Sequence, residues 1–326
     1  MIQDKMQNNM VRNLENFLEM MTVEKLVSAN TIVSYRSDIN DLLLFLTSNN
    51  MALEAATYNQ LSLYISHLHD MSYTSSTIAR KISAIRTFFS FLLLDGVTTA
   101  NPTTRLALPK KIQTLPRVLS RINIAKLIEA AKFDKTPCGV RNLAMLEILY
   151  STGIRVSELV TIEVEGVVYA LNSSEHTIII RGKGGRERLI ILNEAAITAV
   201  KEYLLVRYSI VPKLNLAKVS WLFHSLSKKG KVTHISRQKF GQILKELAIH
   251  KGVSAKIVSP HKIRHSFASH MLQNGADVRV IQELLGHVSI SSTQIYTKVE
   301  NQHMASELAA KHPLSNFSDI LPDEEA

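Results

Sequence analysis

The sequence has very little cysteine and no long apolar segment. Cys138 is the only cysteine among 326 residues, which excludes a framework of intramolecular disulfides and fits the reducing cytosol. No apolar run approaches the roughly 20 residues that a helix needs to cross a bilayer. The first residues, MIQDKMQNNM, lack the apolar core of a secretory signal. We therefore expect a cytoplasmic protein without a membrane segment.

The signatures of nucleotide and metal cofactors are missing as well. The glycine-rich segment 181–188, RGKGGRER, is no phosphate loop, because it opens no helix and has no Ser or Thr after its lysine. His261 and His265 have the spacing of a zinc helix, but no glutamate lies between them, and Arg264 would repel a cation. Cys138 has no base nearby, which favours a half-buried structural thiol over a nucleophile. We expect neither a metal nor a cofactor.

Positive charge is what the sequence does contain. Its 38 Lys and Arg residues exceed its 28 Asp and Glu residues, for a formal net charge of +10. Several of the acids are concentrated in the tail, at Asp319, Asp323, Glu324 and Glu325, so the rest of the chain is more basic still. Such a field favours a polyanionic partner, although charge alone does not identify nucleic acid.

The first hundred residues predict a bundle of four helices. The apolar spacing indicates helices over 11–28, 31–49, 58–70 and 75–94. Asn30 or Thr31 is placed to cap the second helix, and Gly96 ends the fourth. The polar face of the fourth helix carries Arg80, Lys81 and Arg86. This face is either merely solvated or lies along a DNA backbone.

A proline-rich stretch separates this bundle from the rest of the chain. Residues 97–116 contain three prolines and no amphipathic period, which predicts an extended linker with its core at 105–116. Three basic residues in it could follow phosphates: Arg105, Lys110 and Lys111. We therefore expect a helical domain at 1–104, a second domain at 117–317 and an acidic tail at 318–326.

The second domain is expected to mix helices with a small antiparallel sheet. Its helices are predicted near 121–132, 139–152, 155–162, 194–208, 235–249, 260–272, 277–285 and 300–311. The segments 176–182 and 187–192 alternate like strands and are joined by a glycine-rich turn at Lys183. A third strand near 164–171 is expected to complete the sheet.

Two segments of this domain offer cations at the edges of helices. Arg155 follows Gly153, where one helix stops and another begins, and Glu158 can lie beside Arg155 on the same helical face. A guanidinium binds two phosphate oxygens at once, although such a pair is also common on protein surfaces. Lys183 at a hairpin tip could protonate a leaving oxygen, or it could simply be solvated.

The segment SPHKIRHSFASHML (259–272) is the most informative. Ser259 and Pro260 form a helix start, which places His261 in the first turn and Arg264 one turn further on the same face. Both then lie near the positive end of the helix dipole, where anions bind. Apolar residues on the opposite face give the helix a core to bury.

The last segment, LLGHVSISSTQIYTKV (284–299), supplies a nucleophile. Gly286 is expected to stop a helix, leaving His287 on a turn, and a short helix from Ser291 then carries Tyr296. Tyrosine has an ordinary pKa of about 10, so it needs a base or cationic surroundings to become reactive. Each of these residues alone has a bland structural interpretation, but their joint occurrence in these contexts predicts a phosphodiester site.

These segments resemble those of the tyrosine recombinase (phage integrase) family, over nearly the whole chain. More narrowly they are similar to the Xer-type chromosome recombinases, and the ending AAKHPLSN favours the XerD branch over the XerC branch. The departures are small. Ile263 replaces the leucine usual in HxLRH, VSIS stands where DLS is more typical, and TIEVEGVVYA lacks an aspartate.

The resemblance implies a fold and a set of roles. It implies a SAM-like, core-binding four-helix bundle followed by an α+β catalytic domain, mainly α overall. Arg155, Arg264 and His287 would bind the scissile phosphate, and Tyr296 would attack to give a 3′-phosphotyrosyl link. Lys183 would protonate the departing 5′ oxygen, His261 would help accept the tyrosine proton, and Glu158 would orient its neighbours. Such chemistry needs no metal and no ATP.

The resemblance also implies partners. Four protomers would hold two sites of double-stranded DNA and exchange strands through a Holliday junction. The helix near 300–311 would pack on a neighbouring protomer. A XerC-like paralogue would complete a heterotetramer that resolves chromosome dimers at division, under control of a DNA translocase. The alternatives are an integrase of a mobile element, a type IB topoisomerase and a non-catalytic DNA-binding protein.

Overall fold

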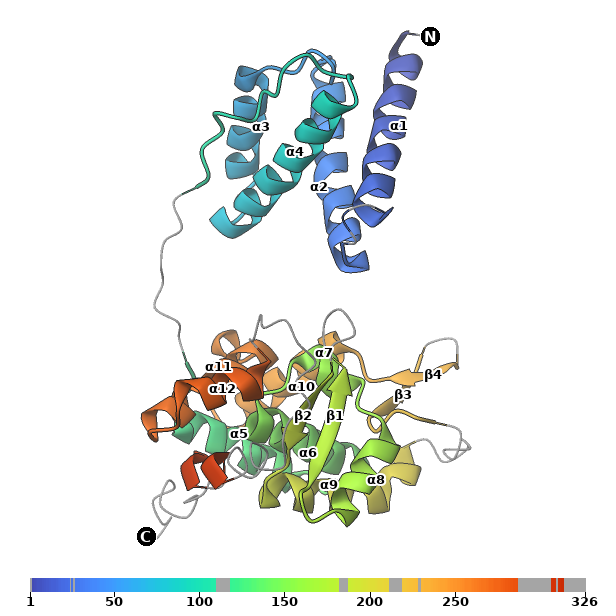
Figure 1. Cartoon of the computed structure of the whole chain (residues 1–326). Coiled ribbons are helices and arrows are strands. Elements are labelled where there is room, and N and C mark those ends of the chain that lie inside the picture. The colour runs from blue at the N-terminus through green and yellow to red at the C-terminus, as the bar shows by residue number, and fades with distance from the viewer. Residues whose placement is uncertain are drawn as a thin grey trace. The chain divides into compact units, whose positions relative to one another are not determined.

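A computed structural model describes residues 2–23, 25, 27–109, 118–181, 187–210, 219–227, 230–286, 306–308 and 310–313. The chain separates into two compact units, which we call the N-terminal unit (Met1–Thr114) and the C-terminal unit (Leu115–Ala326) (Figure 1). Helices dominate both units, and the strands form short antiparallel pairs in the C-terminal unit. This arrangement confirms the predicted mainly helical, two-domain fold.

The described residues of the N-terminal unit form four helices. They are α1 (Ile2–Val23), α2 (Ala29–Ser48), α3 (Tyr58–Asp70) and α4 (Ser75–Leu94). The second begins earlier than predicted. Ser28, rather than Asn30 or Thr31, is its N-cap, because the Ser28 hydroxyl accepts the Thr31 N–H at 3.3 Å. Threonine side chains cap α3 and α4 in the same way.

Aromatic rings fill the centre of this unit. Phe17 of α1 meets Phe88 of α4 edge to face, with ring centroids 5.2 Å apart, and both side chains are fully buried. Tyr64 of α3 is also buried and packs against Phe45 of α2. These contacts join all four helices around one apolar core, which a bundle of short helices needs in order to be stable.

The basic face of α4 differs from the prediction. Lys81 is only 2% exposed, and its ammonium lies 2.5 Å from Asp41 and 3.3 Å from Asp38 of α2. A lysine buried between two carboxylates holds the helices together and cannot also contact a phosphate, so Lys81 leaves the set of predicted DNA contacts. Arg80 is half-exposed and pairs with Asp38, whereas Arg86 donates to the carbonyl of Leu106.

Most of the C-terminal unit is helical. Its helices are α5 (Arg121–Phe133), α6 (Pro137–Thr152), α7 (Val156–Val160), α8 (Val164–Asn172), α9 (Glu194–Val206), α10 (Arg237–His250), α11 (Pro260–Gln273) and α12 (Val278–Leu285), with 3-10 turns η2 (Arg207–Ile210) and η4 (Ala255–Ile257). Helix α6 is central, because it packs against α5, α9 and α11. Thr136 caps α6 and Ser259 caps α11, each followed by a proline at the first helical position.

Two hairpins accompany these helices. Strands β1 (Thr177–Arg181) and β2 (Glu187–Ile191) pair antiparallel as predicted, with Ile180 opposite Arg188. The predicted third strand is wrong, because residues 164–172 form helix α8. Its buried residues, Val167 and Ala170, are spaced three apart, which turns one helical face toward the core. The second hairpin, β3 (His224–Leu226) with β4 (Val232–His234), was not predicted.

The described part of the C-terminal segment packs on its own unit. Leu308 is buried in the core, and the buried His312 ring lies against Tyr150 and Phe267. The side-chain amide of Asn274 donates to the carbonyl of Lys311 at 2.8 Å. This contact lies within a single chain, so the predicted docking of the helix near 300–311 on a neighbour stays a prediction.

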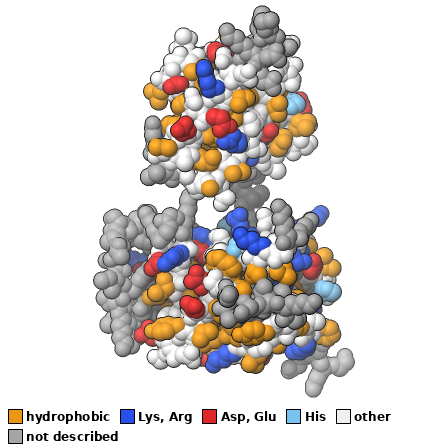
Figure 2. Space-filling view, turned by 90° about the vertical axis from the view of Figure 1, so that its right-hand side faces the viewer, with side chains coloured by type: hydrophobic (Ala, Val, Ile, Leu, Met, Phe, Trp, Pro, Cys, Tyr) orange, Lys and Arg blue, Asp and Glu red, His pale blue; other side chains and the backbone are white. Residues whose placement is uncertain are grey.

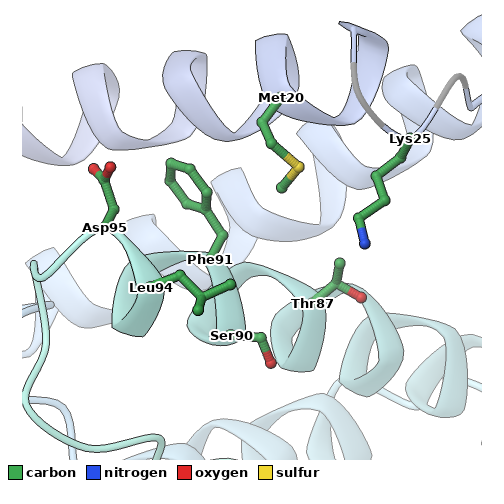
Figure 3. A pocket seen from close by; sticks show the side chains of 7 residues that line it. All are labelled: Met20, Lys25, Thr87, Ser90, Phe91, Leu94 and Asp95. Carbon is green, nitrogen blue, oxygen red and sulfur yellow. The ribbon is translucent and has the colours of Figure 1, made fainter.

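One groove opens on the surface of the N-terminal unit, between the end of α1 and α4, with a volume of about 320 Å³ (Figure 3). It is lined by Met20, Lys25, Thr87, Ser90, Phe91, Leu94 and Asp95. Elsewhere, exposed hydrophobic side chains are scattered among charged ones over both units (Figure 2). Cys138 is exposed, which corrects the half-buried thiol of the prediction.

The described residues contain no group of three or more His, Cys, Asp or Glu side chains that could hold a metal ion. No helix among them is both long enough and apolar enough to cross a membrane.

Four buried titratable groups make the stability of the C-terminal unit depend on pH, three histidines in one direction and one glutamate in the other. Burial lowers the pKa of His224, His270 and His312 to about 4, so these rings are neutral in the folded chain. Their contribution to stability is present above the ordinary pKa of 6.5 and is lost as the pH falls toward 4. Burial raises the pKa of Glu147 to about 7, so its contribution is full below 4.5 and is lost as the pH rises through 7.

Glu147→Gln is therefore expected to stabilise the protein on the alkaline side. Glutamine keeps the shape of the neutral acid but need not lose a proton, so the variant should gain roughly 1–3 kcal/mol over the parent at pH 8 and little at pH 4.5. Urea unfolding across this pH range measures the difference. Glu246→Gln, on the exposed face of α10, is the control and should show no such trend. Equal stability of parent and Glu147→Gln at pH 8 would contradict the expectation.

Candidate active site

The site begins where α6 ends. Gly153 terminates α6 in the left-handed conformation at φ 60°, and a Cβ there would meet Phe267 at 2.5 Å and Leu285 at 2.8 Å. Only glycine accepts both that conformation and that contact. The chain therefore turns sharply between α6 and α7, and this turn presents Arg155 as the residue that precedes α7.

Glu158 holds two arginines that come from different elements. Its carboxylate accepts the backbone N–H of Arg155 at 2.9 Å, and its Oε1 accepts Nη1 of the same arginine at 2.9 Å. Its Oε2 also accepts Nη2 of Arg188 on β2 at 2.6 Å. Glu158 is only 4% exposed, so these charge-assisted bonds form in a largely desolvated place.

Arg264 reaches the same place from α11. Pro260 and the Ser259 cap start that helix, and Arg264 lies in its second turn with 7% of its surface exposed. Its Nη1 donates to the carbonyl of Gly153, and its Nη2 donates to the carbonyl of Leu285 at 2.6 Å. Ile263, Phe267 and Met271 of the same helix are buried, as predicted.

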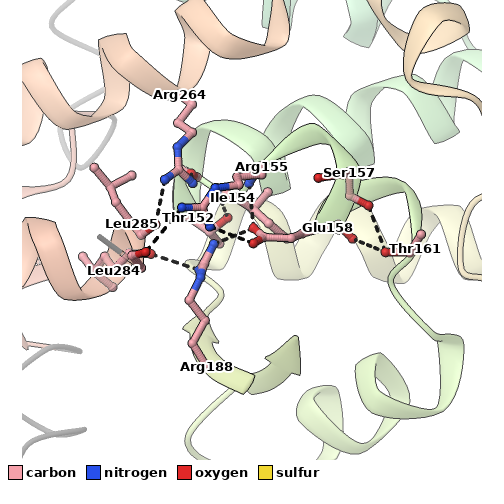
Figure 4. A network of polar contacts seen from close by, with 12 residues as sticks. Thr152, Ile154, Arg155, Ser157, Glu158, Thr161, Arg188, Arg264, Leu284 and Leu285 are labelled. Atoms are coloured by element: carbon pink, nitrogen blue, oxygen red, sulfur yellow. Dashed lines mark hydrogen bonds and ion pairs between the residues drawn. The ribbon is translucent and has the colours of Figure 1, made fainter. Parts of the chain in front are cut away.

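Three guanidinium groups converge on the C-terminal end of α12. Arg188 donates to the carbonyl of Leu284 at 3.1 Å, Arg264 to that of Leu285 at 2.6 Å, and Arg155 to that of Gly286 at 3.3 Å. Figure 4 shows Arg264 and Arg188 pointing toward these carbonyls from opposite sides. The last carbonyls of a helix have no partner within it and carry its negative dipole end, so cations are stabilised there.

The cluster has more positive than negative charge. Its three arginines face one carboxylate, that of Glu158. Burial, together with the charges of Arg155 and Arg188, lowers the pKa of Arg264 to about 10. The group remains protonated at neutral pH, and the charges of Arg155 and Arg188 repel its own. An anion bound among them would relieve this repulsion.

Both predicted phosphate-binding arginines keep donors for such an anion. A guanidinium carries five N–H donors, and the described bonds of Arg264 and of the Arg155 side chain each use two nitrogen atoms. The Arg155 side chain is 38% exposed, so it can be reached from solvent. The arrangement can therefore bind a phosphate with a planar, two-pronged grip.

Some of the predicted site residues are brought together and others lie outside the description. Arg155, Glu158 and Arg264 meet in one network, and His261 is exposed in the first turn of α11. The residues outside the described ranges are Lys183, His287, Tyr296, Lys110 and Lys111. Arg105 is described and exposed.

Arg188 is the member of the network that sequence reasoning missed. It pairs opposite Ile180 on β2, and it lies two residues before the buried Ile190, so it occupies an inward-facing strand position. Strand alternation would have marked a charged residue at an inward-facing position, which needs a buried partner. That signal is present in the segment ERLIIL.

Comparisons with known proteins agree with this geometry. Residues 117–303 match the phage integrase family, and residues 14–96 match the phage integrase N-terminal SAM-like domain. Among curated relatives, tyrosine recombinase XerD of Caulobacter vibrioides is 41% identical over 91% of this chain and 95% of its own. Tyrosine recombinase XerD of Rickettsia bellii is 39% identical over 93% and 98%.

Solved structures share the fold. XerH site-specific recombinase bound to palindromic difH substrate aligns with a TM-score of 0.64 at 20% identity, over 85% of this chain and 79% of its own. A lambda integrase dimer bound to a COC′ core site aligns with a TM-score of 0.63 at 18% identity, over 87% and 98%. The chain belongs to the phage integrase family and is a site-specific recombinase of the tyrosine type.

Proposed function

We propose that this recombinase cuts and rejoins double-stranded DNA through a covalent bond to Tyr296. The tyrosine oxygen attacks the scissile phosphorus, the bond to the 5′ oxygen breaks, and a 3′-phosphotyrosyl link forms. His261 helps accept the tyrosine proton, and Lys183 gives a proton to the departing 5′ oxygen. One phosphoester replaces another, so the step is reversible and needs no ATP.

A single observation carries this proposal. Arg155 and Arg264, predicted separately as phosphate ligands, donate to neighbouring carbonyls at the end of α12, directly before His287 in the sequence. Two guanidiniums with spare donors then lie together at the end of α12, where they would hold a phosphate and stabilise the charge that develops on its non-bridging oxygens.

The domain roles follow from the same reasoning. We assign DNA binding to the helical domain at 1–104, to a linker at 105–116, and to the catalytic domain at 117–317, with a tail at 318–326. The net charge of +10 and the exposed Arg105 support this assignment. Arg80, Arg86, Lys110 and Lys111 remain proposed backbone contacts. Phosphate contacts position a protein on DNA without reading its sequence.

For the biological reaction we propose the XerD role. The protein would work with a XerC-like paralogue in a heterotetramer that passes through a Holliday junction and resolves chromosome dimers, controlled by a DNA translocase. The curated relatives named XerD support this role over that of a mobile-element integrase. The ending AAKHPLSN favours the XerD branch over the XerC branch.

Covalent capture tests the reaction class. The purified protein is incubated with nicked genomic fragments, and DNA that stays bound after denaturation is sequenced. We expect adducts at one short sequence, and two copies of it on a supercoiled plasmid should recombine once the XerC-like paralogue is added. Relaxation of plasmids that lack the sequence would instead identify a type IB topoisomerase. Complete recombination without the paralogue would overturn the partner role.

A further inference from the structure

Strand β2 carries a buried cation, Arg188, that lies against the site. The proposed mechanism gives this cation no role. Arg188 is 9% exposed and lies at an inward-facing position of β2, beside apolar neighbours. Its Nη2 donates to Glu158 at 2.6 Å, and its Nη1 donates to the Leu284 carbonyl at 3.1 Å. One planar side chain thus joins the carboxylate that holds Arg155 to the helix that ends before His287.

We infer that Arg188 is a positioning residue for the recombination chemistry: it sets Arg155 through Glu158 and fixes the end of α12. The inference rests on the proposed function, since Arg155 is a proposed phosphate ligand. It assigns no contact between Arg188 and DNA.

The first path runs through Glu158. This carboxylate is 4% exposed and accepts from both Arg155 and Arg188, so each arginine offsets part of its charge. Without Arg188, Arg155 alone would offset the charge of the Glu158 carboxylate. The carboxylate would then attract the Arg155 guanidinium more strongly and pull it away from an incoming phosphate. A buried charge that loses one of two partners strengthens or rearranges what remains.

The second path runs through α12. The Cβ that any other residue would add at Gly286 meets Nε of Arg188 at 2.7 Å and its Cδ at 2.8 Å. Gly286 also ends α12 in the left-handed conformation at φ 64°. The arginine therefore lies flush against the end of α12, and only glycine at position 286 leaves it room.

The geometry separates this role from that of Lys183. Arg188 belongs to β2, the strand that follows Lys183 in the sequence, and its described bonds lead to α7 and α12. Its loss should therefore damage phosphate binding in the transition state rather than protonation of the leaving group. A substrate whose leaving group needs no proton distinguishes the role of Arg188 from that of Lys183.

The test compares Arg188→Met with the parent protein in single-turnover cleavage of a nicked suicide duplex that carries the captured sequence, at saturating protein. We expect cleavage roughly 10- to 100-fold slower with DNA affinity retained. A 5′-bridging phosphorothioate should not restore the rate. Arg188→Lys keeps the charge without the planar fork and should show a smaller loss. Arg181→Met, on the exposed partner strand, is the matched control and should cleave like the parent.

A double-mutant cycle with Glu158→Gln supplies the second readout. If Arg188 acts through Glu158, the two losses will not add, whereas independent sites add. Parent-like cleavage by Arg188→Met, additive losses, or rescue by the phosphorothioate would each overturn the inference. If the methionine variant does not fold, as judged from its thermal unfolding, the lysine variant undergoes the same cycle. An absent adduct in the parent protein would reject the proposed function instead.

Discussion

A Tyr296→Phe variant is expected to bind its DNA site normally and to form no covalent adduct with it. Phenylalanine keeps the ring but removes the oxygen that would become bonded to phosphorus, so no later step can begin. The effect should be a complete loss of the denaturation-resistant complex. Gel shift measures binding, and trapping on nicked suicide duplexes measures cleavage.

The matched control for this prediction is Tyr169→Phe. Tyr169 lies on α8 and is 74% exposed, so the same chemical change should leave both binding and cleavage as in the parent. Adducts that persist in Tyr296→Phe would place the nucleophile at another residue, and mass spectrometry of the trapped peptide would identify it. Loss of binding together with cleavage would assign Tyr296 a structural role.

Lys183→Ala should slow cleavage by roughly 100- to 10,000-fold, which is the range for losing a general acid. Lys183 lies in the turn between β1, which ends at Arg181, and β2, which begins at Glu187. A lysine ammonium can give a proton to the departing 5′ oxygen. Single-turnover cleavage on suicide duplexes measures the loss.

A change of leaving group shows whether Lys183→Ala is slow because it lacks a proton donor. Sulfur departs without a proton, so a 5′-bridging phosphorothioate should restore much of the rate in Lys183→Ala. Lys231→Ala, an exposed lysine of the second hairpin, should need no rescue. An unrestored rate would remove the general-acid role and would leave Lys183 as a phosphate ligand or a structural residue.

Local signals were sufficient for much of the site. A glycine stop at Gly153, a Ser259 cap followed by proline, and the i, i+3 spacing of Arg155 and Glu158 each depend on a few neighbouring residues. The structure reproduces all three. Such patterns are reliable because their energetics are settled within one or two helical turns.

The errors came where distant contacts decide. Residues 164–172 are rich in β-branched side chains, which favoured a strand, but Val164, Val167, Val168 and Leu171 also recur at helical spacing, and packing selects the helix. Nothing local to α4 shows that Lys81, and not Arg80, meets two aspartates of α2. Arg188 escaped notice because its partners lie on α7 and α12, far from it in the sequence.

The hydrogen bonds of Arg155 and Arg264 to the end of α12 have a consequence for DNA affinity. An arginine side chain that is free in solution has about 2 kcal/mol of rotamer entropy to lose when it is fixed. Here the carbonyls of Gly153, Leu285 and Gly286 restrain both guanidinium planes through hydrogen bonds within the chain. The protein therefore meets this ordering cost when it folds, and the phosphate enters a preorganised receptor.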